Sequence, residues 1–156
     1  LYSVGAQRVS IVETRNGGGL PKPGSLLKSS VLHEVWSKGK KPIAAHWQEQ
    51  PADEEYFHCL VKLMAFGEHY LSVSDCKEHS DFYNYLTSDG VIEAYFFPIG
   101  LNSREGCLLH LRIDWSEKRE DLAPAEKEEV RRAVSEIARN AKITGYQGQH
   151  VKKSKE

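Results

Sequence analysis

Long apolar segments, paired cysteines and an excess of charge of either sign are all missing from this chain of 156 residues. No apolar run approaches the roughly 20 residues that span a bilayer, so we expect no membrane partner. The three cysteines are an odd number without metal-binding spacing, which favours a reduced, cytoplasmic interior over a disulfide framework. With 21 basic and 22 acidic residues the net charge is −1, which argues against a nucleic-acid partner.

A signal peptide and internal repeats are missing too, and the chain opens on Leu1 rather than Met, which indicates a fragment. Its length suits one domain. We expect residues 1–145 to form that domain. Residues 146–156 are basic and carry no apolar pattern, so we expect a disordered tail.

Catalytic and phosphate-binding signatures are also missing. Asn16-Gly17-Gly18-Gly19 allows a tight backbone turn, but neither the GxxxxGK[ST] spacing nor a helix follows it. No Ser-His-Asp or Cys-His arrangement can be assembled from spacing alone. We therefore expect a turn at the glycines and no enzymatic activity.

Strand patterns are what the chain does contain. Pro98 cannot donate to a ladder, so the strand before it should end there. Alternation and apolar runs predict strands at Gln7–Thr14, Tyr70–Asp75, Val91–Phe97 and Cys107–Trp115, a strand or a strand with a helical turn at Ser25–Trp36, and a short extended stretch at Pro42–Trp47.

Helical periodicity marks three further segments. Asp53–Phe66 has apolar residues at i, i+3, i+4, i+7 and i+8, acidic residues in its first turn, and Gly67 as its C-cap. Ser80–Leu86 is predicted as a short helix capped by Ser80. The last helix runs from Pro124 to about Lys142, with a clean apolar stripe.

Cys107–Trp115 is the strongest strand, and its two faces differ. One face is apolar, and the other carries His110, Arg112 and Asp114. If that face is covered, its polar groups must be paired or face a ligand. If it is solvated, they are ordinary exterior residues, which we expect of Asp114 more than of His110. The strand should pair antiparallel with Val91–Phe97.

Several segments together resemble GAF domains. Ser88–Ile99 is similar to a late GAF strand, which typically ends in Pro followed by Leu or Ile, and Gly106–Leu111 is similar to the next strand. Leu122–Glu126 looks like the start of the closing helix, and Ala6–Val12 like the first strand. The Asn16-Gly17-Gly18 turn resembles a GAF-like subgroup with this turn at the same place.

The resemblance implies an α+β fold with a central antiparallel sheet of five or six strands. Terminal helices would lie on one face, and loops and middle helices would roof a small-molecule pocket on the other. Only Leu1–Gly5 is left for the usual first helix, so we expect that helix to be truncated. The implied function is a non-catalytic sensory or regulatory domain of a signalling protein. Most aromatic side chains must fill the core, but the pocket position favours as ligand-binding residues Trp47, Tyr56, Tyr70 and Tyr95, together with His110.

Metal and cofactor sites have weaker support. Cys76 and His79 have a C-x2-H spacing, but His58 and Cys59 would point about 100° apart on one helix, so both cannot readily serve one ion. Some GAF domains hold haem or bilin, yet no cysteine here clearly matches a bilin attachment site, and the cyclic-nucleotide pattern is not recognisable. We expect no metal and no cofactor.

Two further functions stay open. The first is a thiol-dependent reductase of a small metabolite such as free methionine sulfoxide, although the cysteines are spaced more widely than that chemistry suggests. The second is a structural dimerisation module whose pocket is filled by its own aromatic side chains. A homodimer would form through the terminal helices, and a monomer is an equal alternative.

Overall fold

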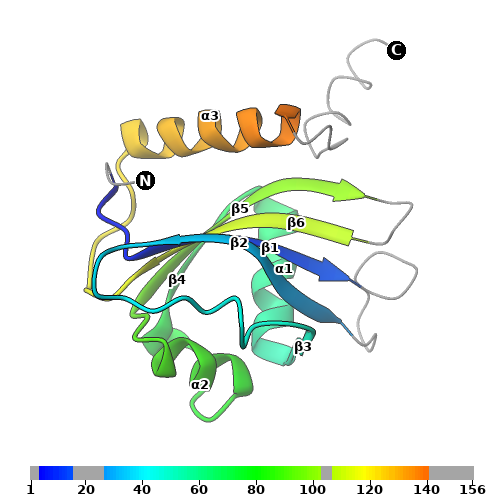
Figure 1. Cartoon of the computed structure of the whole chain (residues 1–156), viewed down its shortest axis with the longest axis vertical. Coiled ribbons are helices and arrows are strands. Elements are labelled where there is room, and N and C mark those ends of the chain that lie inside the picture. Colours follow the sequence, from blue (N-terminus) through cyan, green and yellow to red (C-terminus); the bar gives the residue numbers. More distant parts are fainter. Residues whose placement is uncertain (1–3, 16–26, 103–106, 141–156) are drawn as a thin grey trace.

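The computed structural model describes residues 4–15, 27–102 and 107–140 of the chain. Six strands form one antiparallel sheet in the order β3-β2-β1-β6-β5-β4 (Figure 1). This arrangement confirms the predicted α+β fold class. The strands are β1 (Arg8–Arg15), β2 (Lys28–Trp36), β3 (Gln50–Pro51), β4 (His69–Ser72), β5 (Glu93–Asn102) and β6 (Cys107–Trp115).

Helices cover both faces of the sheet. Helix α3 (Pro124–Asn140) lies on one side, and α1 (Glu54–Phe66) and α2 (Asp81–Ser88) lie on the other (Figure 1). Helix α1 begins where the Asp53 carboxylate accepts the Tyr56 N–H, and it ends at Gly67, whose φ of 79° is left-handed. The predicted C-cap and buried stripe are therefore present, and Asp53 is the N-cap rather than a residue of the first turn.

The sheet separates two apolar cores. On the α3 face, β5 and β6 present Tyr95, Phe97 and Ile113 to the buried Val130 and Val134 of α3. On the α1/α2 face, apolar residues of both helices pack over Phe96 and Leu108. Because both faces of the sheet are covered, the polar face of β6 is buried as well.

Two segments differ from the predicted strands. Residues Pro42–Trp47 are not extended: the backbone N–H groups of His46 and Trp47 both donate to the Ile43 carbonyl, which makes a turn. Strand β4 ends at Ser72, and Val73–Asp75 form the 3-10 helix η2 instead of continuing the strand. In both places the apolar side chains are buried by tertiary packing on an irregular backbone rather than on a strand.

The prediction that the strand ends before Pro98 is also wrong, since β5 continues to Asn102. Strand β4 pairs with β5 only as far as Phe96, which lies opposite His69. At Pro98 that edge of β5 is therefore open, and no backbone N–H is needed there. On the other edge the pairing with β6 shifts register between Pro98 and Gly100. The proline is therefore accommodated at an irregular, half-open position of the ladder.

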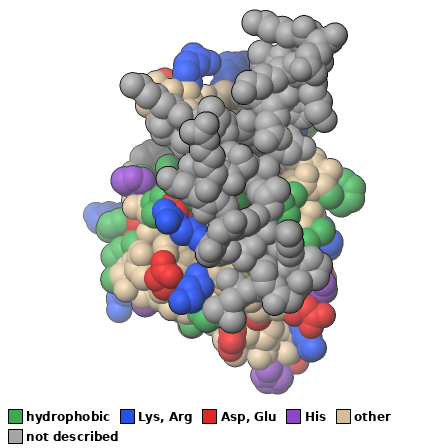
Figure 2. All heavy atoms as spheres, turned by 90° about the vertical axis from the view of Figure 1, so that its right-hand side faces the viewer, with side chains coloured by type: hydrophobic (Ala, Val, Ile, Leu, Met, Phe, Trp, Pro, Cys, Tyr) green, Lys and Arg blue, Asp and Glu red, His purple; other side chains and the backbone are tan. Residues whose placement is uncertain are grey.

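Some predicted features lie outside the described residues, namely the Asn16-Gly17-Gly18-Gly19 turn and the tail at 146–156. Within the described residues, no helix has the length and apolar character that crossing a membrane requires. Figure 2 shows acidic, basic and hydrophobic side chains interspersed over the described residues that are visible on that side of the molecule.

Candidate functional site

The candidate site lies on the α1/α2 face, where polar side chains of β1 and β6 are enclosed. His110, Arg112 and Asp114 expose 0%, 1% and 0% of their surface. The expectation that Asp114 is an exterior residue is therefore wrong: its side chain is fully buried, and its carboxylate accepts a hydrogen bond from Arg8 of β1. We call Arg8, Ser10, His110, Arg112 and Asp114 the polar floor.

Strand register brings these residues together. Arg112 lies opposite Ser10 of β1 and Phe96 of β5, and Asp114 lies opposite Arg8 and Ala94. Side chains directly opposite on antiparallel strands share a face and lie within contact distance. The polar floor thus covers three successive cross-strand rows in the middle of the sheet, the third being that of His110 opposite Val12.

Ion pairs organise one half of the floor. Arg112 donates from Nε to Asp114 Oδ1 at 2.9 Å and from Nη2 to Oδ2 at 3.0 Å, and Arg8 Nη1 donates to the same Oδ2 at 3.3 Å. Glu34 of β2 lies 3.8 Å from Arg8 Nε. Burial opposes the charge of Arg112, but the Asp114 carboxylate outweighs it and raises the pKa of Arg112. Two guanidinium groups therefore face two carboxylates, and the formal charges cancel.

The other half of the floor is neutral. The Tyr56 hydroxyl of α1 lies 3.4 Å from His110 Nε2 and 3.4 Å from Thr14 Oγ1. Burial raises the pKa of Tyr56 to about 12, and burial together with the Arg112 charge lowers the pKa of His110 to about 3. Both side chains are uncharged near neutral pH, so they can supply hydrogen bonds but no charge.

The roof over the floor is aromatic and comes from a connection between β2 and β3, which we call the strap (residues 37–49). Trp47 of the strap lies over Arg112, with the guanidinium carbon 4.7 Å from the ring centre, and its Nε1 donates to Ser29 Oγ at 3.0 Å. Tyr85 and Phe82 of α2 flank the indole at 5.2 and 6.5 Å between ring centres. Trp47 is 2% exposed, so the chain itself fills the space above Arg112.

The predicted ligand residues separate into two groups. Trp47, Tyr56 and His110 lie together on the α1/α2 face. Tyr70 and Tyr95 lie on the α3 face, where the Tyr70 hydroxyl donates to Glu93 Oε2 at 2.7 Å and Tyr95 stacks on Phe97 at 4.6 Å. Successive side chains of a strand point to opposite faces of the sheet, so Tyr95 and Phe96 lie on different faces. This alternation could have shown from the sequence that Tyr95 does not share a face with its neighbour Phe96.

Sequence reasoning missed Arg8, Ser10 and Ser29 as site residues. Arg8 and Ser10 alternate with Val9 and Ile11 and read as the solvated face of a half-buried strand. The signal that could have found them is their pairing with Arg112 and Asp114, because a row of polar residues on neighbouring central strands requires partners when it is covered.

Metal and thiol chemistry find little support at this site. Among the described residues, no group of three or more His, Cys, Asp or Glu side chains is placed to hold a metal ion. All three cysteines are buried. Burial raises the pKa of Cys59 to about 12 and that of Cys76 to about 11, which opposes thiolate formation.

Comparison with known proteins identifies the fold. No protein-family model and no curated protein matches the sequence. A far-red cyanobacteriochrome photoreceptor is 13% identical over 89% of this chain and 78% of that chain, with a TM-score of 0.62. A phycocyanobilin-bound GAF domain from a cyanobacterial phytochrome is 16% identical over 88% and 75%, with a TM-score of 0.56.

A third similar structure is the GAF domain of a two-component sensor histidine kinase from Bacillus halodurans, 15% identical over 85% of this chain and 79% of that chain, with a TM-score of 0.54. These likenesses cover most of the chain at low sequence identity, so they show the fold. The chain has the fold of GAF domains, and the resemblance seen in its sequence is confirmed at that level.

Proposed function

We propose that the domain binds a small molecule on the α1/α2 face and serves as a non-catalytic sensory or regulatory module of a signalling protein. The observation that carries this proposal is the polar floor itself. Ser10 Oγ, His110 Nδ1 and Arg112 Nη1 are buried without a hydrogen-bond partner, side by side on one face of the sheet. Buried polar atoms without partners are rare in folded proteins and indicate a place where a further polar group binds.

The similar structures support the sensory part of the proposal. They are a photoreceptor domain and a domain of a sensor histidine kinase, which are proteins that respond to a signal. The buried thiols favour a binding role over the rival reductase role. We propose no cofactor, and we place the domain in the cytoplasm because its three cysteines are an odd number without metal-binding spacing.

The experiment that tests this function combines native mass spectrometry of the protein as purified with a thermal-shift screen of metabolites. A ligand at about 100 times its Kd should stabilise the domain by about 2.7 kcal/mol. Ser10→Ala is the diagnostic variant, because its hydroxyl has no partner to lose within the protein. The variant should keep its melting temperature without ligand and lose part of the ligand-induced shift.

The matched control is Ser74→Ala, at an exposed position on η2. It should change neither the melting temperature nor the ligand shift. A screen that yields no bound compound and no shifting compound would contradict the binding function and favour a structural module.

A second proposal is a homodimer through α3. A groove of about 230 Å³ runs between α3 and strands β1 and β2, and its lining is largely apolar, with Val9, Ile11 and Leu111 from the sheet and Ala133 and Ile137 from the helix. Helix α3 forms one wall of this groove. In a two-fold dimer each protomer would place its α3 in the groove of the other, so that both grooves are buried in one interface.

Light scattering tests the dimer. Ala133→Glu puts a charge into the groove and should shift a dimer to the monomer mass of 17.7 kDa, whereas Ala125→Glu, on an exposed part of the first turn of α3, should not. A constant monomer mass of the unmodified chain up to high micromolar concentration would contradict the dimer.

A further inference from the structure

The strap has the geometry of a hinged segment. Gly39 near its start has φ 85°, and Glu49 at its end has φ 53°. Glycine adopts this left-handed region freely, but a glutamate there is strained. The two left-handed residues bracket the part of the strap that carries Ile43 and Trp47 onto the polar floor.

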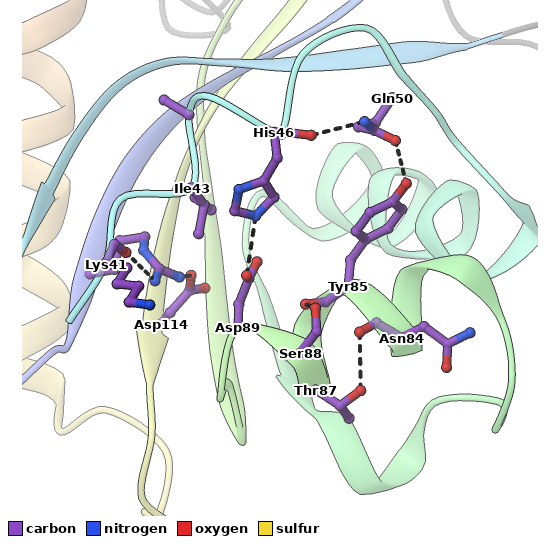
Figure 3. Close-up of polar contacts among 12 residues, drawn as sticks. Lys41, Ile43, His46, Gln50, Asn84, Tyr85, Thr87, Ser88, Asp89 and Asp114 are labelled. Carbon is purple, nitrogen blue, oxygen red and sulfur yellow. Dashed lines mark hydrogen bonds and ion pairs between the residues drawn. The ribbon is translucent and has the colours of Figure 1, made fainter.

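Polar contacts, some exposed and some part-buried, hold the strap closed. Figure 3 shows His46 of the strap reaching Asp89 at the end of α2, with Nε2 to Oδ1 at 3.2 Å. It also shows Gln50 linking the His46 carbonyl, at 2.9 Å, to the Tyr85 hydroxyl. The Glu34 carboxylate accepts the N–H groups at 43 and 44, at 3.0 and 2.9 Å. Water can replace such partners when the strap moves away.

The closed strap matches its floor only in part: the Lys41 carbonyl accepts Arg8 Nη2 at 3.1 Å, but other donors of the floor have no partner. Apolar parts of Ile43 and Trp47 are buried in the core above the floor, while Ser10 Oγ, Arg8 Nε and Arg112 Nη1 have no hydrogen-bond partner. These three groups can all donate a hydrogen bond. A better-matched occupant would therefore present a hydrogen-bond acceptor to them.

Trp47 indicates the rest of the occupant's chemistry. It shows that the space above Arg112 accepts a planar aromatic ring, lying over the guanidinium and donating one N–H to Ser29. The charges of Arg8 and Arg112 are already balanced by Asp114 and Glu34. An additional buried charge would have no counter-ion, which favours an uncharged acceptor such as an amide over a carboxylate.

We propose that Trp47 occupies the ligand site while the strap is closed. The ligand of this site is an uncharged planar aromatic compound with an amide or carbonyl acceptor. It enters when the strap swings out on Gly39 and Glu49. The inference rests on the proposed small-molecule function and specifies its ligand class. The closed state competes with the ligand, so every change that loosens the strap should tighten apparent binding.

The first experiment opens the site by Trp47→Gly and measures binding of two probes by calorimetry, indole-3-carboxamide and indole-3-carboxylate. The affinity of the carboxamide for the variant should be at least about tenfold higher than its affinity for the unmodified chain. The variant should also bind the carboxamide more tightly than it binds the carboxylate. The control is Trp36→Gly, which removes an indole that is 42% exposed outside the site and should leave affinity unchanged. A folded Trp47→Gly variant that binds neither probe, or that prefers the carboxylate, overturns the proposal.

The second experiment stays decisive if Trp47→Gly fails to fold. His46→Ala removes the contact to Asp89 at an exposed position and should tighten binding of indole-3-carboxamide severalfold. His58→Ala, on the exposed side of α1, is the matched control and should not. Equal affinities of the two variants overturn the proposal.

Fluorine NMR of the chain labelled with 5-fluorotryptophan shows where the probe binds, because the three tryptophans lie in different places. Trp115 lines a separate cavity of about 350 Å³, and Trp36 lines another small one. Addition of the carboxamide should move the Trp47 resonance toward its solvent-exposed position. If native mass spectrometry finds a bound ligand and this resonance does not move, Trp47 is not displaced and the further inference is wrong. The proposed small-molecule function would still stand.

Discussion

Arg112 and Asp114 form a two-pronged ion pair within one strand, with both side chains almost completely buried. Residues two apart on a strand point to the same face, so the pair is set by the strand geometry of β6 alone. Arg8 from β1 adds a third charge to the same carboxylate. The pair is therefore both an element of the fold and the charged half of the candidate site.

Asp114→Asn should destabilise the domain strongly. The substitution leaves the buried Arg8 and Arg112 without that carboxylate, and loss of one partner from a buried pair costs about 3–5 kcal/mol. Urea unfolding followed by circular dichroism measures the change. Glu117→Gln, at an exposed position just after β6, should change stability by no more than about 0.5 kcal/mol. Equal stabilities of the two variants would show that Asp114 is not buried in this network.

His110 should make the domain sensitive to acid. Its pKa is lowered to about 3 in the folded state, against 6.5 ordinarily. Below pH 6.5 the unfolded chain therefore takes up a proton that the folded chain does not accept until about pH 3. The contribution of His110 to the free energy of unfolding is fully present above pH 6.5. Between pH 6.5 and about pH 3 it falls by about 1.4 kcal/mol per pH unit.

His110→Gln should remove that part of the pH dependence, and the exposed control His33→Gln should retain it. The comparison is made between free energies of unfolding from pH 7.5 to 4, so that the titration of carboxylates cancels in the difference. Parallel curves for the unmodified chain and His110→Gln would contradict a buried neutral histidine.

The main elements of the fold were predictable because each depends on a local pattern. Period-two alternation identified β1 and β6, and an apolar stripe with Asp53 and Gly67 at its ends identified α1. Asp114 was misjudged because one strand pattern does not tell whether the second face is solvated or covered. That property depends on α1, α2 and the strap, which are distant in the sequence.

The candidate site was only partly predictable for a related reason. Trp47, Tyr56 and His110 come from a loop, a helix and a strand, and no spacing in the sequence relates them. The turn at Ile43 that carries Trp47 onto Arg112 has backbone bonds that a short apolar run does not specify. The polar partners Ser10 and Ser29 show no distinguishing pattern until the register of β1 with its neighbours is known.

The cysteines should be unreactive in the folded domain. All three side chains are buried, and the raised pKa values of Cys59 and Cys76, about 12 and about 11, leave little thiolate at pH 8. Ellman's reagent should react slowly with the native protein and rapidly with three thiols in urea. A rapidly reacting thiol, with peroxide-induced pairing and turnover of free methionine sulfoxide, would instead support the reductase.

Asp53 should matter more than an ordinary helix cap, because its carboxylate holds two helices. Oδ1 accepts the Tyr56 N–H at the start of α1, and Oδ2 accepts the Phe82 N–H in the first turn of α2, each at 2.9 Å. Loss of a cap costs about 1 kcal/mol, and a hydrogen bond to a charged group contributes about 1.5–3 kcal/mol. Asp53→Ala should therefore lower the free energy of unfolding by about 2.5–4 kcal/mol.

Two further variants separate the cap from the connection between the helices. Ser80→Ala removes a cap that serves only α2, where its hydroxyl accepts the Tyr83 N–H, and should cost about 1 kcal/mol. Asp53→Asn keeps one acceptor oxygen but presents an NH₂ group at the second position, so its cost should lie between those of Ser80→Ala and Asp53→Ala. Urea unfolding gives all three values. If Asp53→Ala costs no more than Ser80→Ala, the carboxylate does not connect α1 to α2, and each of these two helices is held over the sheet by its own contacts.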